Sequence, residues 1–88
     1  MTFKKLITST DNVSAGRPIR IFGIVLYGGS DTATVRLDAA AAVGTNDFFK
    51  MEAVAASKND YSWENGITVD NLSVVLTGTG PTLYIYYA

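Results

Sequence analysis

Short stretches in which apolar and polar residues alternate are separated along the chain by clusters of turn-forming residues. The clusters are rich in Gly, Asn, Asp and Ser, and they recur at short, fairly even intervals. This spacing is typical of an all-β sandwich or barrel. The turn-forming clusters lie at residues 11–12, 16, 28–31, 44–47, 57–60, 65–66, 70–71 and 78–81.

The segments between these turns are rich in Val, Ile, Thr, Tyr and Phe, which favour pleated, half-buried strands. We therefore predict an all-β fold, a single small antiparallel β-sandwich of jelly-roll-like type with about seven short strands. Residues 1–88 form one domain, in which residues 1–13 are an N-terminal arm or an edge strand. The predicted strands cover residues 4–10, 18–27, 32–38, 48–54, 67–69, 72–77 and 82–87.

Three segments need a choice between elements. In residues 47–57, apolar side chains alternate with Lys50 and Glu52 as in a strand, but the run also has high helix propensity; we favour the strand. Residues 39–43 are too short for an independent helix and predict a tight loop. The Gly-Thr-Gly at residues 78–80 has no following Lys-Ser/Thr for a phosphate loop, so it predicts a hairpin turn between the last two strands.

Alternation also assigns the faces of the strands. In residues 82–87, Leu83 and Ile85 share one face, and Tyr84 and Tyr86 share the other. Residues 18–27 differ, because strict alternation places apolar side chains on both faces, and we expect the second face to meet another element or subunit. The two sets are Ile19, Ile21, Val25 and Tyr27 on one face, and Phe22, Ile24 and Leu26 on the other.

Composition narrows the classes of function. Of the 88 residues 48% are hydrophobic, and the chain has no Cys and no His. It therefore lacks an imidazole base, a thiolate nucleophile and the usual nitrogen and sulfur ligands of zinc, so we expect no enzyme, no metal site and no cofactor. A domain of this size is marginally stable alone, and without disulfides or metals it is expected to gain stability from oligomerisation or docking.

The charge and the N-terminus exclude further partners. Seven basic and eight acidic residues give a net charge of −1, so we expect no nucleic-acid binding. The N-terminal Lys4-Lys5 is followed by only two apolar residues, which is too short for a signal peptide, so we expect synthesis in the cytoplasm without secretion. No apolar run is long enough to cross a membrane.

The tyrosines near the C-terminus are the main candidate binding residues. Tyr84 and Tyr86 form an outward aromatic strip, which suits a protein interface. Tyrosine is also simply a good strand former whose hydroxyl can remain in water. A third interpretation adds Trp63 to the two tyrosines as a platform on which sugars stack.

The order of several segments resembles small β-sandwich virion proteins of tailed bacteriophages. Residues 14–25 contain a Gly-Arg step followed by a hydrophobic strand with an internal glycine. Val-Arg-Leu-Asp at residues 35–38 is followed by a Gly-containing turn, and residues 76–87 contain a Gly-Thr-Gly turn and a final Tyr-rich strand. Residues 63–69 also contribute to the resemblance, which extends from about Ser14 to the C-terminus.

This resemblance implies a virion structural role. We expect a capsid decoration, or cement, protein on the head surface that binds assembled major capsid protein and copies of itself, with a trimer favoured on symmetry grounds. Alternatives are a tail, baseplate or head-fibre component, or a carbohydrate-binding adhesin module. The residues expected at the protein interface are Tyr84, Tyr86, Phe22, Ile24, Leu26, Arg17, Arg20 and Arg36. The three arginines are candidates for pairing with capsid carboxylates, and the alternative is that they are simply solvated beside the strands.

Overall fold

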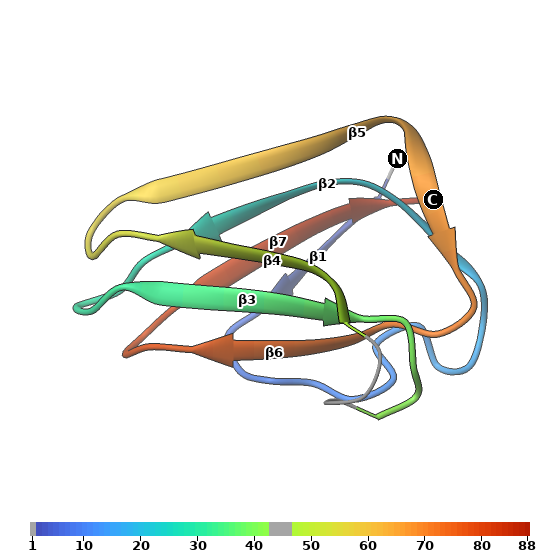
Figure 1. The fold of residues 1–88 in the computed structure, drawn as a ribbon, viewed down its shortest axis with the longest axis horizontal. Coiled ribbons are helices and arrows are strands. Elements are labelled where there is room, and N and C mark those ends of the chain that lie inside the picture. Colours follow the sequence, from blue (N-terminus) through green and yellow to red (C-terminus); the bar gives the residue numbers. More distant parts are fainter. Residues whose placement is uncertain (1, 43–46) are drawn as a thin grey trace.

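Seven strands in two antiparallel sheets make up the computed structural model, which describes residues 2–42 and 47–88 and has no helix among them (Figure 1). The all-β prediction is therefore confirmed. The strands are β1 (Thr2–Leu6), β2 (Ile19–Tyr27), β3 (Ala33–Asp38), β4 (Asp47–Ala53), β5 (Lys58–Val69), β6 (Ser73–Thr77) and β7 (Thr82–Tyr87).

The two sheets pack face to face as a sandwich. One sheet has the order β1-β7-β2-β5 and the other the order β4-β3-β6. Figure 1 looks onto the three-stranded sheet, with most of the four-stranded sheet behind it and β5 along the top. Among the described strands, only β3 and β4 follow each other in sequence and also pair with each other. The connection from β1 to β2 stays in one sheet but skips β7, which lies between them, and the other connections cross from one sheet to the other.

The segment that follows β1 takes the place of an eighth strand. Thr10 exchanges two backbone hydrogen bonds of 2.8 Å with Val74 of β6, and Val13 N–H donates to the Leu72 carbonyl at 2.6 Å. With residues 9–13 placed beside β6, both sheets have four members, and the chain alternates between them everywhere except at β3 and β4. This is the arrangement of a jelly roll with one strand reduced to a bridge.

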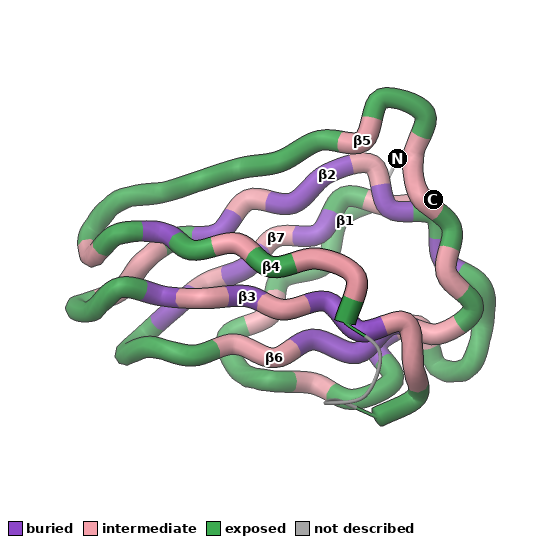
Figure 2. Tube along the Cα trace, viewed as in Figure 1, coloured by how far each residue is buried: buried purple, intermediate pink, exposed green. Residues whose placement is uncertain are grey.

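The core lies between the sheets and comes from the alternate residues of the central strands (Figure 2). In β3, Ala33, Val35 and Leu37 are buried, and in β7, Leu83 and Ile85 are fully buried. The inward and outward positions that alternation predicts for these two strands are confirmed. Further core residues are Val13, Ile19, Ile21, Ile24, Leu26, Ala53, Leu72 and Val74.

A β-bulge in β2 overturns the predicted second apolar face of that strand. The register against β7 shifts by one residue between Ile21 and Gly23. The extra residue shifts the alternation of β2 by one position. Odd-numbered residues before the bulge and even-numbered residues after it therefore point to the same side of the sheet. Ile24 and Leu26, predicted to face outward toward a partner, are 1% and 0% exposed and belong to the core.

Strand β5 is much longer than the predicted strand at residues 67–69. It begins at Lys58, and the predicted turns at residues 57–60 and 65–66 fall largely within it. Its pairing with β2 skips residues 63–66, where the strand turns a corner at Gly66, whose φ is +77°. The prediction of two turns was wrong because turn-forming polar residues lie along this edge strand and at its corner, where they produce the same sequence pattern as loops.

Residues 78–81 do not form the predicted hairpin. The strands on either side belong to different sheets, because β6 pairs with β3 whereas β7 pairs with β1 and β2. The segment instead crosses from one sheet to the other and packs on residues 28–31. There, Ser30 N–H donates to the Thr79 carbonyl at 3.0 Å, and the Thr79 hydroxyl donates to Asp31 at 2.8 Å.

The predicted strand in residues 47–57 is confirmed as β4. Residues 39–42 contain neither helix nor strand, in agreement with the predicted loop, whereas residue 43 and residues 44–46 of the turn expected at residues 44–47 lie outside the described residues. Asp47, the last residue of that expected turn, is the first residue of β4.

Candidate functional site

Four aromatic side chains gather on the outer surface of the four-stranded sheet. The ring of Tyr84 lies 5.9 Å from that of Phe3 and 6.0 Å from that of Tyr27, and the rings of Phe3 and Tyr86 are 6.1 Å apart. We call these four residues the outer aromatic face. Phe3 is 59% exposed, Tyr27 40% and Tyr86 36%. Rings at these separations interact favourably with one another while much of their surface stays in contact with water.

Strand register explains why these rings meet. In β7, Tyr84 and Tyr86 alternate with the buried Leu83 and Ile85, so both tyrosines point away from the core. Phe3 of β1 lies directly opposite Tyr86. The sequence prediction of an outward tyrosine strip is confirmed in its geometry. It omitted Phe3 and Tyr27, because only the pairing of β1 and β2 with β7 places them beside the tyrosines.

Phe22 is outward but separate from this face. The Arg20 guanidinium carbon lies 5.2 Å from the centre of the Phe22 ring. Arg20 Nε also donates to the Asn65 carbonyl at 2.9 Å, and a second guanidinium nitrogen donates to the same oxygen. Arg20 thus ties the corner of β5 to β2, and these nitrogens are engaged within the chain.

The other two predicted arginines lie on different surfaces. Arg17 is exposed and lines a hollow near the chain ends with Lys4 and Tyr87. Arg36 Nε lies 3.5 Å from Oδ1 of the fully buried Asp38. The structure therefore does not bring Arg17, Arg20 and Arg36 together as one basic patch.

A second aromatic cluster closes the side of the sandwich between β4 and β5. The rings of Phe49, Tyr61 and Trp63 lie 4.9 to 5.1 Å from one another. We call these three residues the mouth cluster. Tyr61 is 46% exposed, and it lies opposite the buried Ile24, on the inner side of its sheet. Trp63 therefore does not share a platform with Tyr84 and Tyr86.

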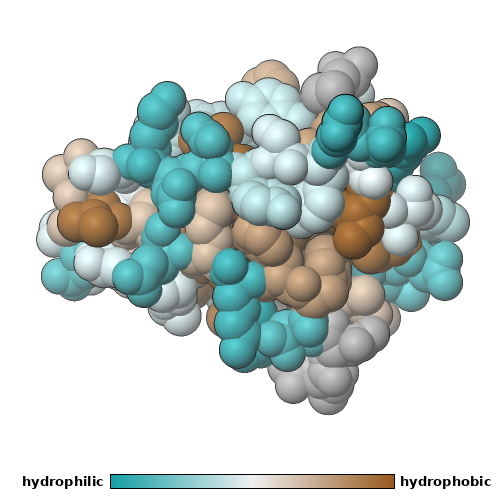
Figure 3. All heavy atoms as spheres, turned by 45° about the horizontal axis from the view of Figure 1, so that its top comes forward, coloured by the Kyte–Doolittle hydropathy of each residue, from teal (hydrophilic) through white to brown (hydrophobic). Residues whose placement is uncertain are grey.

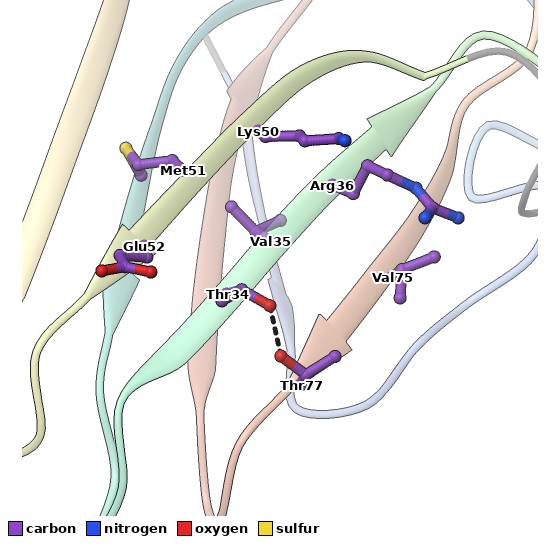
Figure 4. Close-up of a pocket in the computed structure, with 8 residues that line it drawn as sticks. All are labelled: Thr34, Val35, Arg36, Lys50, Met51, Glu52, Val75 and Thr77. Atoms are coloured by element: carbon purple, nitrogen blue, oxygen red, sulfur yellow. Dashed lines mark hydrogen bonds between the residues drawn. The ribbon is translucent and has the colours of Figure 1, made fainter.

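The outer surface of the three-stranded sheet is hollowed and is lined by both polar and apolar side chains (Figure 4). The Thr34 and Thr77 hydroxyls share a hydrogen bond across it, and Arg36 of β3 lies directly opposite Lys50 of β4. Lys50 Nζ is 3.5 Å from the Asp47 carboxylate. The hollow has a volume of about 440 Å³ and is lined by Thr34, Val35, Arg36, Lys50, Met51, Glu52, Val75 and Thr77.

Clusters of metal-ligating side chains and membrane-spanning helices are absent from the part of the chain that the structure describes. No three acidic side chains in residues 2–42 and 47–88 approach one another closely enough to hold a metal ion. None of these residues forms a helix of the length and apolarity that a membrane span requires.

Comparisons with known proteins give no relative. No family model, no curated protein and no solved structure matches the chain. Of the surfaces described above, the outer aromatic face combines four aromatic side chains from three paired strands, β1, β2 and β7.

Proposed function

We propose that this chain is a non-enzymatic virion structural protein, a capsid decoration protein that docks on assembled major capsid protein through the outer aromatic face. The single observation that carries this proposal is the contiguous set of Phe3, Tyr27, Tyr84 and Tyr86 on one exposed sheet surface. The virion setting comes from the resemblance described above.

The chemistry of the outer aromatic face suits a protein partner. Interface cores are enriched in tyrosine and phenylalanine, which bury a large area at a low cost in side-chain entropy. The phenol hydroxyls of Tyr84 and Tyr86 can find hydrogen-bond partners at the rim while their rings are buried. The strands β1, β7 and β2, which are hydrogen-bonded to one another, support the four side chains of this face.

A decoration role also fits the marginal size of the domain. Binding of the folded form stabilises it by mass action, and a shell offers many equivalent sites at high local concentration. Arg17 is the predicted arginine that remains available for a capsid carboxylate, because Arg20 and Arg36 have partners within the chain. The expected trimer remains a prediction of the same proposal, for copies bound around a symmetry axis of the shell.

The test is binding to expanded capsids that were assembled without this chain. We expect saturable binding with a copy number fixed by the lattice, together with a higher melting temperature of the shell. Phe3→Ser and Tyr86→Ser should each weaken binding at least about tenfold, which is the typical loss for an aromatic anchor at an interface. Sedimentation of capsid-bound protein and differential scanning calorimetry measure the two effects.

Val54→Ser is the matched control, because Val54 is 64% exposed and lies outside the outer aromatic face. Its binding should equal that of the unmodified protein. Absence of capsid binding, or equal losses in all three variants, would contradict the proposal. Binding on a glycan array that is lost with Tyr86→Ser, in protein that ignores capsids, would indicate a carbohydrate module instead.

A further inference from the structure

Within the described residues, three strands have an edge without a paired neighbour. They are β1 and β5 at the two sides of the four-stranded sheet, and β4 in the other sheet. The edge of β6 is covered, because residues 9–13 bond to it. An open edge presents unpaired backbone groups that can bind another strand.

The edge of β5 differs from the edge of β1 in its charges. β1 carries Lys4 and Lys5 and no acidic residue, so two copies of β1 would bring lysines together. Lysines of this kind are a common means of blocking an edge. β5 carries Lys58 near its start and Glu64 at its corner, with Asp60 between them.

Antiparallel pairing of β5 with the β5 of a second copy can place opposite charges face to face. A two-fold axis at Tyr61 places Lys58 opposite Glu64 of the second copy, and Asp60 opposite Ser62. Opposite charges at facing positions stabilise a strand pair, whereas like charges destabilise it. Both Lys58–Glu64 contacts form, because a two-fold axis repeats each of them.

Neighbouring registers are less favourable. An axis at Asp60 places that carboxylate opposite itself, and an axis at Ser62 places Asp60 opposite Glu64. An axis at Asn59 pairs Lys58 with Asp60 of the second copy. In that register, however, Trp63 does not face any of residues 58–62 of the second copy. The charges on β5 therefore exclude the axes at Asp60 and Ser62, and the position of Trp63 favours the axis at Tyr61 over the axis at Asn59.

The same register joins the two mouth clusters. Tyr61 then lies opposite Tyr61 of the second copy. The Cβ atoms of two residues that face each other across antiparallel strands are about 5 Å apart. The Tyr61 ring, 46% exposed and already 5.0 Å from Trp63, would then be covered by the matching ring. Figure 3, which brings the β5 side forward, shows pale and brown surface in the middle of this face and strongly hydrophilic groups on both sides.

We propose that the edge of β5 is a self-association site, where two copies of this chain pair antiparallel about Tyr61 and form one continuous sheet. A single strand edge buries less area than a permanent dimer does, so the association is expected to be micromolar. The site lies apart from the outer aromatic face, and the proposal does not depend on capsid binding.

Sedimentation equilibrium of the purified full chain over a range of concentrations tests the pairing. We expect a monomer–dimer equilibrium. Lys58→Glu and Glu64→Lys should each raise the dissociation constant at least about tenfold by placing like charges opposite each other, and the double variant should restore it. Tyr61→Ser should also weaken the dimer.

Lys5→Glu is the matched charge control on the edge of β1, and it should leave the dissociation constant unchanged. Far-ultraviolet circular dichroism should be the same for all variants, since the substituted side chains are exposed. A monomer or a trimer at every concentration would overturn the proposal. So would a dimer that is insensitive to Lys58→Glu, or one in which Asp60→Lys rather than Glu64→Lys compensates for it.

Discussion

At the scale of single residues, the bulge at Phe22 decides which side chains of β2 enter the core. Before it, Ile19 and Ile21 point inward, and after it Ile24 and Leu26 do. Gly23 follows the bulge, where a Cβ atom would lie only 3.2 Å from the Tyr61 carbonyl oxygen. The close approach of β5 at this point therefore favours glycine.

The bulge makes opposite predictions for two adjacent aliphatic residues. Ile24→Ala removes a side chain that is 1% exposed and should lower the free energy of unfolding by about 2–5 kcal/mol, because it leaves a cavity. Val25→Ala, at a half-buried outward position, should cost about 1 kcal/mol. Urea unfolding followed by circular dichroism measures both. A larger loss for Val25→Ala would contradict the inward position of Ile24.

At the scale of elements, the corner of β5 shows how one strand can serve two parts of a sheet. Residues 58–62 pair with one half of β2 and residues 67–69 with the other. The residues between them turn through Gly66, at φ +77°, and Arg20 holds the corner through the Asn65 carbonyl. The corner therefore depends on a backbone conformation that favours glycine and on a side chain packed against it.

Two glycines with positive φ separate these contributions. Gly80→Ala, at φ +72° with no atom within 4 Å of the new Cβ, should cost about 1 kcal/mol of unfolding free energy from backbone strain alone. Gly66→Ala adds a contact of 2.6 Å with Arg20 Nε and should cost about 2–4 kcal/mol. Chemical denaturation of the two variants gives the comparison. Equal losses would show that Arg20 moves aside freely and does not hold the corner.

The elements that the sequence predicts well are those with strict alternation in a single environment. β3 and β7 are examples, since each has one face on the core and one in water. β5 was largely missed, because its polar residues lie along an open edge and include turn formers such as Asn59 and Gly66. Alternation describes a local period, so it cannot detect a bulge that a neighbouring strand imposes.

The candidate site was predicted in part for the same reason. Tyr84 and Tyr86 lie in one strand, so their common face follows from the sequence. Phe3 and Tyr27 join them only through the pairing of distant strands. The mouth cluster likewise combines β4 with β5, which belong to different sheets.

At the scale of the whole molecule, the edges of the sheets differ in whether another segment of the chain covers them. The edge of β6 is covered from within by residues 9–13, whereas β5 stays open with matched charges. The Ser9 hydroxyl contributes to this cover, because it accepts from Leu76 N–H at 2.9 Å and donates to the Leu76 carbonyl at 3.2 Å. The cover closes the three-stranded sheet at β6 and completes the jelly roll.

Removal of one backbone donor should reopen the edge of β6. Thr10→Pro deletes the N–H that bonds to the Val74 carbonyl, and we expect a loss of about 1–3 kcal/mol in unfolding free energy. It should also speed hydrogen exchange at the Val74 amide, whose acceptor is the Thr10 carbonyl. Thr10→Val is the matched control, because it keeps the backbone N–H and loses only the hydroxyl bond to the Thr8 carbonyl. Unchanged exchange at Val74 in the proline variant would mean that residues 9–13 do not protect this edge.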